Sequence, residues 1–286
     1  MRKKFTILLC LLLLTVVCTL SVGENVQAKK AASVKEVYRE MSKNFLAGKK
    51  NFSILCRKKV AVSIVDKINS KKDMVYYSVL FQMAQATDKK TTTDDGDYLY
   101  GNMKEVNCYY SRGKLRFYGI KYFETKKQTK AVNQKVNKVS KQIQKKGKTA
   151  YKRISMVYKY VIDHVRYDER KNCNYSAYDG FYKKRTVCNG YAMMVYKLLM
   201  KQGIPCKIVT GSVKEGQNWY LHAWNMVKIK GKWYNLDACS DDADDGQVYA
   251  DYFLKSDKTF SRDHKKDSFY CTKAFKKKYP MSKRDY

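Results

Sequence analysis

Three residues of this chain could together carry out nucleophilic chemistry: Cys188, His222 and Asp237, in that order along the sequence. A thiol can act as the nucleophile, an imidazole can move its proton, and a carboxylate can orient the imidazole. The 286 residues contain only three histidines, and one of them opens the distinctive run His-Ala-Trp-Asn at residues 222–225. The three residue types therefore predict a cysteine-nucleophile site.

The residues that follow Cys188 have the spacing of a buried helix. Apolar side chains recur three and four positions apart, at Tyr191, Met194, Val195, Leu198 and Leu199. Gly203 and Pro205 end this pattern. Cys188 is therefore expected at a helix N-terminus. Such a position, together with a nearby imidazolium, lowers the pKa of a thiol from its usual ~8.5 and favours the nucleophilic thiolate.

A hairpin is predicted to bring the histidine and the aspartate together. Strands are expected at residues 206–212, 220–229 and 232–238. If Ile229 pairs with Lys232 across a two-residue turn, His222 and Asp237 share one face of the sheet as diagonal neighbours, about 7–8 Å apart at the backbone. The opposite face is then a core face, made of Leu221, Ala223, Val227, Ile229, Tyr234 and Leu236. A shift of one residue would break both the burial pattern and the His–Asp pair.

Each member of this set has an expected role. Cys188 attacks a carbonyl as the thiolate, and His222 accepts the thiol proton and later protonates the leaving group. Asp237 accepts a hydrogen bond from the other ring nitrogen and so fixes the tautomer. The Cys188 backbone N–H is one expected oxyanion donor, and a second is expected from the loop at 175–187.

The motifs around these residues resemble the transglutaminase-like superfamily, over about residues 150–264. They are Val-Cys-Asn-Gly-Tyr-Ala at 187–192, Gly-Ile-Pro-Cys-Lys-Ile-Val-Thr-Gly at 203–211, His-Ala-Trp-Asn at 222–225 and Gly-Lys-Trp-Tyr-Asn-Leu-Asp at 231–237. The resemblance, which is to secreted bacterial members, implies an α+β fold with a papain-like core. In that core an N-terminal helix bearing Cys188 packs on an antiparallel sheet bearing His222 and Asp237, which the resemblance carries over as the catalytic triad.

Two departures from the family pattern concern the surroundings of the site. Thr186 stands two residues before the nucleophile, where a glycine is usual. Cys-Ser-Asp-Asp at residues 239–242 replaces a Thr-Trp-Asp-Asp run that often follows the aspartate, and we expect the missing tryptophan to alter the pocket wall. Neither departure removes a member of the predicted triad.

The resemblance implies a cysteine-dependent acyl-transfer enzyme that acts on peptide or amide bonds through a thioester acyl-enzyme. If water accepts the acyl group, the enzyme is a protease or amidase; if a lysine amine accepts it, the enzyme cross-links proteins. Water is the default acceptor. The expected partner is a protein or peptide substrate, with neither a cofactor nor a metal. The alternative from another class is a non-catalytic basic module that binds the cell wall.

Residues 1–28 have the pattern of a secretory signal peptide. Residues 2–4 are basic, residues 5–20 are apolar, and a small-residue cleavage site at 26–28 precedes Lys29. An uncleaved anchor is the alternative, since the apolar run has about the minimum length for a bilayer. We therefore expect a secreted, extracellular protein with no membrane span after cleavage of the signal.

The formal net charge of +33 favours a polyanion as neighbour. For a secreted protein this means an anionic cell-wall polymer or a lipid surface, and a wall-associated location. Nucleic acid would suit the same charge, but the signal peptide and the lack of a nucleic-acid motif argue against it. A lysine-coated surface without any such partner is an equally weighted alternative.

The remaining cysteines and histidines indicate no metal site. Outside the signal peptide the other cysteines are Cys56, Cys108, Cys173, Cys206, Cys239 and Cys271, whose spacing leaves open whether they form disulfides or buried thiols. There is no CxxC pair for zinc. The acidic run at 241–246 fails as a calcium loop because Ala243 and Tyr252 occupy ligand positions, so a solvated acidic loop is expected. His164 is expected at the surface of a helix end, and His264 is expected to be exposed.

Two regions are expected after the signal peptide: an N-terminal α/β domain at 29–147 and a transglutaminase-like catalytic domain at 148–286. The N-terminal region has no catalytic signature. Helices are predicted at residues 34–47, 60–68, 74–86, 125–145 and 149–166, a strand at 51–55 and a hairpin at 98–122 around the turn 111–113.

Overall fold

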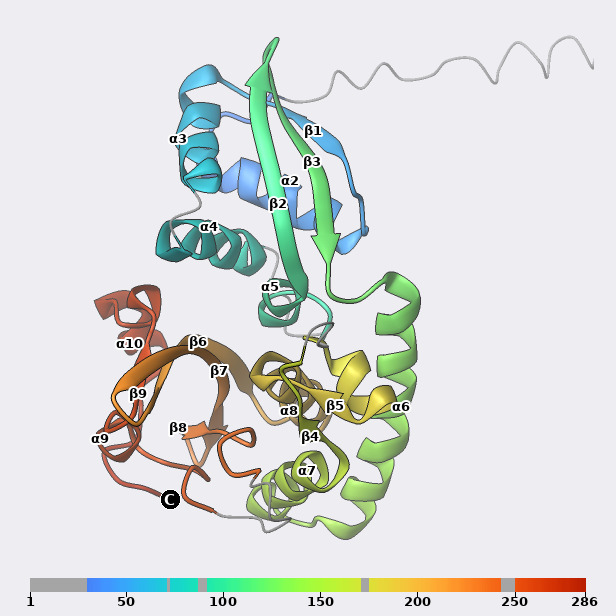
Figure 1. The fold of residues 1–286 in the computed structure, drawn as a ribbon, viewed down its shortest axis with the longest axis vertical. Coiled ribbons are helices and arrows are strands. Elements are labelled where there is room, and N and C mark those ends of the chain that lie inside the picture. The colour runs from blue at the N-terminus through green and yellow to red at the C-terminus, as the bar shows by residue number, and fades with distance from the viewer. Residues whose placement is uncertain (1–29, 71–72, 87–91, 171–174, 243–249) are drawn as a thin grey trace, which may run out of the picture.

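The computed structural model describes residues 30–286 except 71–72, 87–91, 171–174 and 243–249 (Figure 1). The predicted signal peptide at 1–28 and Cys173 lie outside the described residues, so signal cleavage and secretion stay predictions. Within the described ranges, every helix is too short or too polar to cross a bilayer.

The N-terminal part is a small three-stranded antiparallel sheet, in the order β1-β3-β2, covered by helices (Figure 1). Its elements are α2 (Val34–Leu46), β1 (Phe52–Leu55), α3 (Lys58–Asn69), α4 (Asp73–Gln85), α5 (Asp97–Asn102), β2 (Met103–Ser111) and β3 (Lys114–Tyr122). The turn at Arg112 and Gly113 has positive φ at both residues, as a tight two-residue hairpin requires. The predicted hairpin starts later than expected, because residues 97–102 form a helix instead of a strand.

The second part places three helices beside a four-stranded antiparallel sheet of order β8-β7-β6-β9 (Figure 1). Its main elements are α6 (Lys126–Lys146), α7 (Ala150–His164), α8 (Cys188–Lys201), β6 (Cys206–Glu215), β7 (Asn218–Ile229), β8 (Lys232–Leu236) and β9 (His264–Lys266). Shorter elements are β4 (Arg166–Tyr167), η1 (Asp179–Lys183), β5 (Arg185–Thr186), α9 (Asp257–Phe260), η2 (Ser268–Tyr270) and α10 (Lys273–Lys278). The predicted α+β class, with a cysteine-bearing helix on an antiparallel sheet, is confirmed.

The register of the β7–β8 hairpin is the predicted one. Ile229 pairs with Lys232, and Asn225 pairs with Leu236. The connecting residues 230–231 both have positive φ, 47° and 81°, the conformation that matches the twist of two-residue hairpins. The register matters for the site because it decides which side chains share a face with His222.

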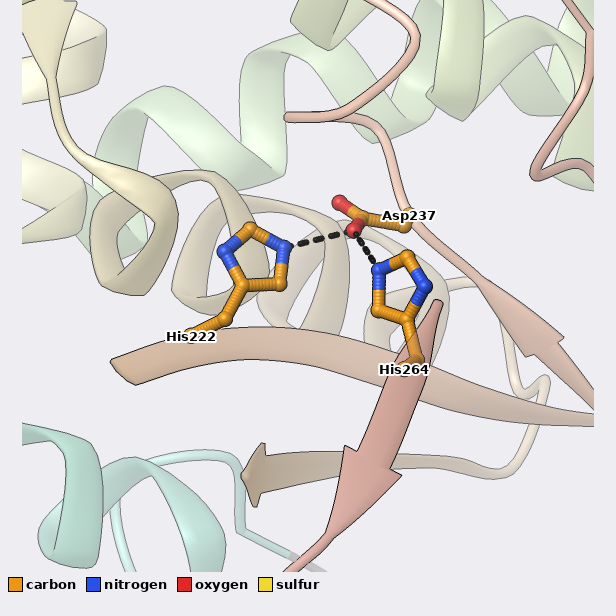
Figure 2. A group of neighbouring side chains, drawn as sticks. All are labelled: His222, Asp237 and His264. Carbon is orange, nitrogen blue, oxygen red and sulfur yellow. Dashed lines mark hydrogen bonds and ion pairs between the residues drawn. The ribbon is translucent and has the colours of Figure 1, made fainter. Parts of the chain in front are cut away.

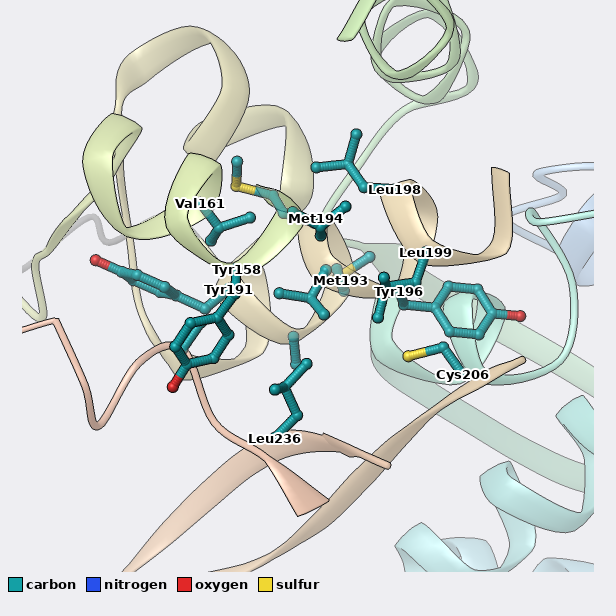
Figure 3. Packing of buried hydrophobic residues seen from close by; sticks show 14 of the residues in the cluster. Tyr158, Val161, Tyr191, Met193, Met194, Tyr196, Leu198, Leu199, Cys206 and Leu236 are labelled. Carbon is teal, nitrogen blue, oxygen red and sulfur yellow. The ribbon is translucent and has the colours of Figure 1, made fainter. Parts of the chain in front are cut away.

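Apolar clusters cover both faces of the sheet. On one face α8 packs between the sheet and helices α6 and α7, and Figure 3 shows part of this cluster. The predicted core residues Ala223, Val227, Ile229, Tyr234 and Leu236 are buried there. On the other face Trp224 and Met226 join the core of the N-terminal part. The sheet is therefore shared by two cores, whereas the sequence pattern predicted only one.

Leu221 does not belong to the core face. Its side chain is 72% exposed. The physical reason is that β8 pairs only with residues 225–229 of β7, so the first half of β7 extends beyond β8. Leu221 lies in that extension beside the exposed Trp219 and Tyr220.

Candidate active site

Cys188 is the first residue of α8, as the sequence predicted. Val187 precedes it in an extended conformation and makes no side-chain cap. The first N–H groups of a helix have no partner within the helix, so they are available to a negatively charged oxygen. Cys188 itself is half-buried, while the next turns of α8 are fully buried. The thiol thus stands at the start of a buried helix and is itself partly exposed.

Thr186, which replaces the usual glycine, is accommodated by a glycine in the next turn. The side chain of Thr186 is completely buried, and its hydroxyl lies 3.4 Å from the carbonyl oxygen of Ser176. A Cβ atom added to Gly190 would lie 1.8 Å from the Thr186 Oγ1 and 2.7 Å from its Cβ. Gly190 therefore leaves the space that the Thr186 side chain fills next to Cys188.

We expect Gly190→Ala to destabilise the fold by about 1–3 kcal/mol, as overpacking of a close-packed interior does. Urea unfolding followed by circular dichroism measures this change. Thr186→Gly removes the clashing atoms, so the double variant should recover most of the loss. Equal stability of Gly190→Ala and its Thr186→Gly double variant would contradict the packing relation between the two positions.

Asn189 connects the start of α8 to two other segments. Its Nδ2 donates to the Gly101 carbonyl at 2.9 Å and to the Tyr175 carbonyl at 2.6 Å. Gly101 belongs to α5 of the N-terminal part, and Tyr175 opens the loop that leads to Cys188. The residue after Cys188 therefore ties the N-terminal part to the candidate site.

His222 and Asp237 form a direct hydrogen bond in which Nε2 lies 2.6 Å from Oδ2 (Figure 2). His222 comes from the half of β7 that extends beyond β8, and Asp237 directly follows β8. Since Nε2 is engaged by the carboxylate, Nδ1 is the ring nitrogen left for a thiol. Burial opposes a positive charge on His222, and Asp237, followed by Cys188, more than offsets this effect and raises the pKa of the imidazole.

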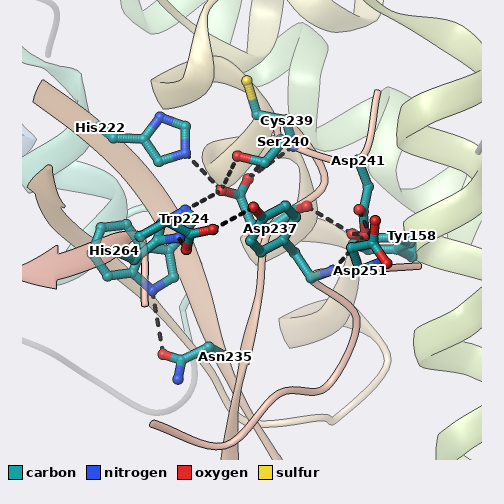
Figure 4. A network of polar contacts seen from close by, with 12 residues as sticks. Tyr158, His222, Trp224, Asn235, Asp237, Cys239, Ser240, Asp241, Asp251 and His264 are labelled. Atoms are coloured by element: carbon teal, nitrogen blue, oxygen red, sulfur yellow. Dashed lines mark hydrogen bonds and ion pairs between the residues drawn. The ribbon is translucent and has the colours of Figure 1, made fainter. Parts of the chain in front are cut away.

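The Asp237 carboxylate is completely buried and held by several donors (Figure 4). Its Oδ1 accepts from the backbone N–H groups of Cys239 at 2.9 Å and Ser240 at 3.2 Å. Its Oδ2 accepts from the Ser240 hydroxyl at 2.8 Å as well as from His222. A third partner of Oδ2 is the Nε2 of His264, at 3.1 Å. The orientation of the carboxylate is thus fixed by its own loop and by a second histidine.

The electrostatics of this group favour an ionised pair. Burial opposes charge on both partners, but the charge and hydrogen bond of Asp237 raise the pKa of His222 well above its ordinary value. His222 and His264 in turn lower the pKa of Asp237 far below that of an ordinary aspartate, again against the effect of burial. At neutral pH Asp237 is therefore a carboxylate, and His222 readily holds a proton.

The sequence pattern placed His264 wrongly. It was expected to be exposed, yet only 2% of it is accessible. The reason is that residues 264–266 form the short edge strand β9, which pairs with β6 and turns the histidine inward. A three-residue strand within a charged run has no apolar alternation that a sequence pattern could reveal. His164, by contrast, is exposed at the end of α7, as expected.

The loop after Asp237 is anchored by tyrosines of two helices. Tyr158 of α7 donates to Asp241, and Tyr191 of α8 donates to Asp242. Burial raises the pKa of Asp241 to about 6, and its side chain is almost inaccessible. The expectation of a solvated acidic loop is therefore wrong for Asp241, because Tyr158 and two backbone N–H groups draw its carboxylate inward. Residues 243–249 lie outside the described residues.

The six described cysteines are free thiols: Cys56, Cys108, Cys188, Cys206, Cys239 and Cys271. Burial raises the pKa of the thiols of Cys56, Cys206 and Cys108, the last to about 12. Burial, followed by the charges of Cys188 and Asp237, also raises the pKa of Cys239. These four cysteines are therefore kept as unreactive thiols at neutral pH.

His222, Asp237 and His264 are also the described group that could ligate a metal ion, since their donor atoms lie within 4.8 Å of one another. The donor types suit zinc. However, Asp237 Oδ2 and the Nε2 atoms of both histidines are already hydrogen-bonded to one another. An ion would have to replace the His222–Asp237 bond, so the arrangement fits proton transfer better than metal binding.

A cavity of about 890 Å³ lies between the N-terminal sheet and α6, away from this group. None of Cys188, His222 and Asp237 lines it. Five lysines do: Lys50, Lys104, Lys121, Lys126 and Lys130. The expected binding of an anionic polymer to the basic surface stays a prediction.

Residues 137–238 match the family model of the transglutaminase-like superfamily. This part of the chain is a transglutaminase-like domain. The matched residues include Cys188, His222 and Asp237. The match begins within α6, whose buried valines and isoleucine pack in the same cluster as α7 and α8.

Several known proteins are similar to parts of this chain. The Kyphoscoliosis peptidase of Homo sapiens is 26% identical over 103 residues, which is 32% of this chain and 16% of that protein. Two solved structures are similar at lower identity. A TGase is 18% identical with a TM-score of 0.37, over 58% of this chain and 51% of that one. A candidate cysteine protease from Cytophaga hutchinsonii is 16% identical with a TM-score of 0.34, over 47% and 61%. The transglutaminase-like domain thus spans only a small share of its curated relative.

Proposed function

We propose that this chain is a cysteine-dependent acyl-transfer enzyme that acts on peptide or amide bonds, with Cys188 as nucleophile, His222 as acid–base and Asp237 as the orienting carboxylate. The observation that carries the proposal is the 2.6 Å bond between His222 Nε2 and Asp237 Oδ2. It commits one ring nitrogen to the carboxylate and leaves the other for the thiol at the start of α8. This is the arrangement that activates a cysteine nucleophile.

The proposed reaction begins with proton transfer from the Cys188 thiol to His222 Nδ1. The Cys188 sulfur then bonds to the carbonyl carbon of the substrate, and the carbonyl oxygen becomes an oxyanion near the N–H of Cys188. As the tetrahedral intermediate collapses, the carbon–nitrogen bond breaks and His222 gives its proton to the departing amine. A thioester between the acyl group and Cys188 remains.

The acceptor decides whether the enzyme hydrolyses or cross-links. Water would pass a proton to His222 as it attacks the thioester, and the carbon–sulfur bond would break to release a carboxylic acid and restore the pair. A primary amine would form a new amide by the same sequence. Cys188 is half-buried rather than enclosed, so water has access, and we propose hydrolysis as the main outcome.

Incubation with a mixed peptide library and a labelled primary amine tests this assignment. Mass spectrometry of the products distinguishes cleavage, deamidation and amine incorporation in one experiment. We expect cleavage or deamidation that depends on Cys188. Predominant amine incorporation would show a cross-linking enzyme instead, and equal product formation by Cys188→Ala would refute the proposed nucleophile.

A further inference from the structure

His264 is a buried histidine for which the acyl-transfer reaction described above has no role. It comes from β9, at the opposite edge of the sheet from the β8 strand that precedes Asp237. Figure 2 shows its ring directed at the same carboxylate oxygen that His222 contacts. Its Nε2 lies 3.1 Å from Asp237 Oδ2, and its Nδ1 lies 2.6 Å from Asp263 Oδ1.

Both ring nitrogens of His264 thus face carboxylate oxygens. An ionised carboxylate only accepts hydrogen bonds, and a neutral imidazole can donate from only one nitrogen. Both contacts are satisfied as hydrogen bonds only when each nitrogen carries a proton. The geometry therefore fits an imidazolium held between Asp237 and Asp263.

The surroundings of the ring fix its position. Aromatic rings of Phe260, Trp224 and Tyr252 pack on it, with centroids 4.0, 5.4 and 5.1 Å from that of His264. The Tyr252 hydroxyl also donates to Asp263 Oδ2 at 2.6 Å, so the second carboxylate is held in place as well.

The backbone around β9 is as closely fitted as the ring. A Cβ atom added to Gly211 of β6 would lie 1.9 Å from the Lys265 carbonyl oxygen and 2.9 Å from the Trp224 ring. The glycine therefore permits the close approach of β9 that brings His264 over the sheet. The position of His264 depends on several independent contacts and not on a flexible loop.

We propose that His264 is a positioning residue of the candidate active site. It holds the Asp237 carboxylate toward His222 and neutralises part of the negative charge of that carboxylate. This inference rests on the proposed function of Cys188, His222 and Asp237. Because His222 and His264 donate to the same oxygen, a positive charge on His264 offsets part of the negative charge that His222 experiences. Their ring centroids are only 5.5 Å apart.

The proposal makes the state of His222 depend on His264. Among the described residues, the titratable groups in contact with His264 are Asp237, His222, Asp263 and Tyr252. If His264 loses its charge, His222 loses a repelling neighbour while Asp237 remains held by Ser240 and by two backbone N–H groups. His222 should then keep its proton to higher pH.

Two variants separate the charge of His264 from its hydrogen bond. His264→Gln keeps an N–H donor that can reach Asp237 but removes the charge. His264→Phe removes both the charge and the hydrogen bond, while its ring fills the space among the neighbouring aromatic side chains. His164→Phe, at the exposed end of α7, is the matched control. We expect kcat/KM to fall about tenfold to hundredfold for His264→Phe, the range that loss of one charge-assisted hydrogen bond corresponds to, and less for His264→Gln.

The decisive measurement is the titration of the His222 side chain, by ¹⁵N NMR in a Cys188→Ala background that does not depend on turnover. We expect His222 to deprotonate at higher pH in both His264 variants than in His164→Phe. If His264→Phe does not fold, His264→Gln carries the test alone. An unchanged His222 titration would overturn the inference even if activity falls, because a purely structural residue would give that result. A wild type without Cys188-dependent turnover would refute the proposed function but leave this titration valid.

Discussion

Cys188→Ala should reduce turnover on a responsive peptide or amide substrate to the background level, a loss of about 10⁶-fold if the residue is the nucleophile. The reason is chemical: without a thiol no thioester forms, and a methyl group cannot accept the acyl group. Cys188 is half-buried at a helix start, so its replacement should leave the free energy of unfolding within about 0.5 kcal/mol of the wild type, as for an ordinary partly exposed site.

The matched control is Cys271→Ala, since Cys271 is an exposed thiol in the C-terminal segment. It should keep wild-type turnover. Steady-state kinetics of the three proteins, with urea unfolding to confirm that each is folded, makes the comparison. Residual activity of Cys188→Ala above a few per cent of the wild type would assign the chemistry to another group.

Asp237→Asn should lower kcat by about 10⁴-fold with the fold intact, by reversing the tautomer of His222. The two backbone N–H groups at Oδ1 would select the amide oxygen for that position. The amide NH₂ would then take the place of Oδ2, donate toward His222 Nε2 and lose the hydrogen bonds that Oδ2 accepts from Ser240 and His264. A neutral His222 would then carry its own proton on Nδ1, so this nitrogen could no longer accept the proton of the Cys188 thiol.

The same variant should change the pH dependence. Asp237 raises the pKa of His222, so in the wild type the active protonated form persists above the ordinary range of histidine. Asp237→Asn removes this cause, and the basic limb of the kcat/KM profile should move to lower pH. Asp163→Asn, an exposed aspartate on α7, is the control and should leave the profile unchanged. A profile for Asp237→Asn that superimposes on that of the wild type would remove Asp237 from the site.

The free energy of unfolding should depend on pH in the direction that the pKa changes of His222 and Asp237 require. The raised pKa of His222 gives stability that is fully present below the ordinary histidine range and is lost as pH rises through the folded-state value. The lowered pKa of Asp237 gives stability that is present above the ordinary aspartate range and is lost as pH falls below it.

The parts of the site that local patterns control could be predicted from the sequence. The helix start at Cys188 follows from apolar spacing, and the β7–β8 register follows from a two-residue turn between alternating strands. Both depend on residues close together in the chain. The hairpin brings His222 and Asp237 into contact without any long-range information.

The parts that depend on contacts between distant segments could not be predicted. His264 is buried because β9 pairs with β6, about fifty residues earlier in the chain, and its charged flanks give no sign of it. Leu221 is exposed because β8 is shorter than β7. The fit of Thr186 beside Gly190 is local in the chain, but it depends on side-chain packing that a sequence pattern does not reveal.

The most direct test of the central claim is the site of covalent labelling by a peptide-mimicking, thiol-reactive electrophile at neutral pH. After brief treatment, intact mass and peptide mapping locate and count the label. We expect one equivalent on Cys188, no labelling of that kind in Cys188→Ala, and much slower labelling in Asp237→Asn. Label on Cys239 or Cys271 in place of Cys188, or unchanged labelling of Cys188→Ala, would contradict the account.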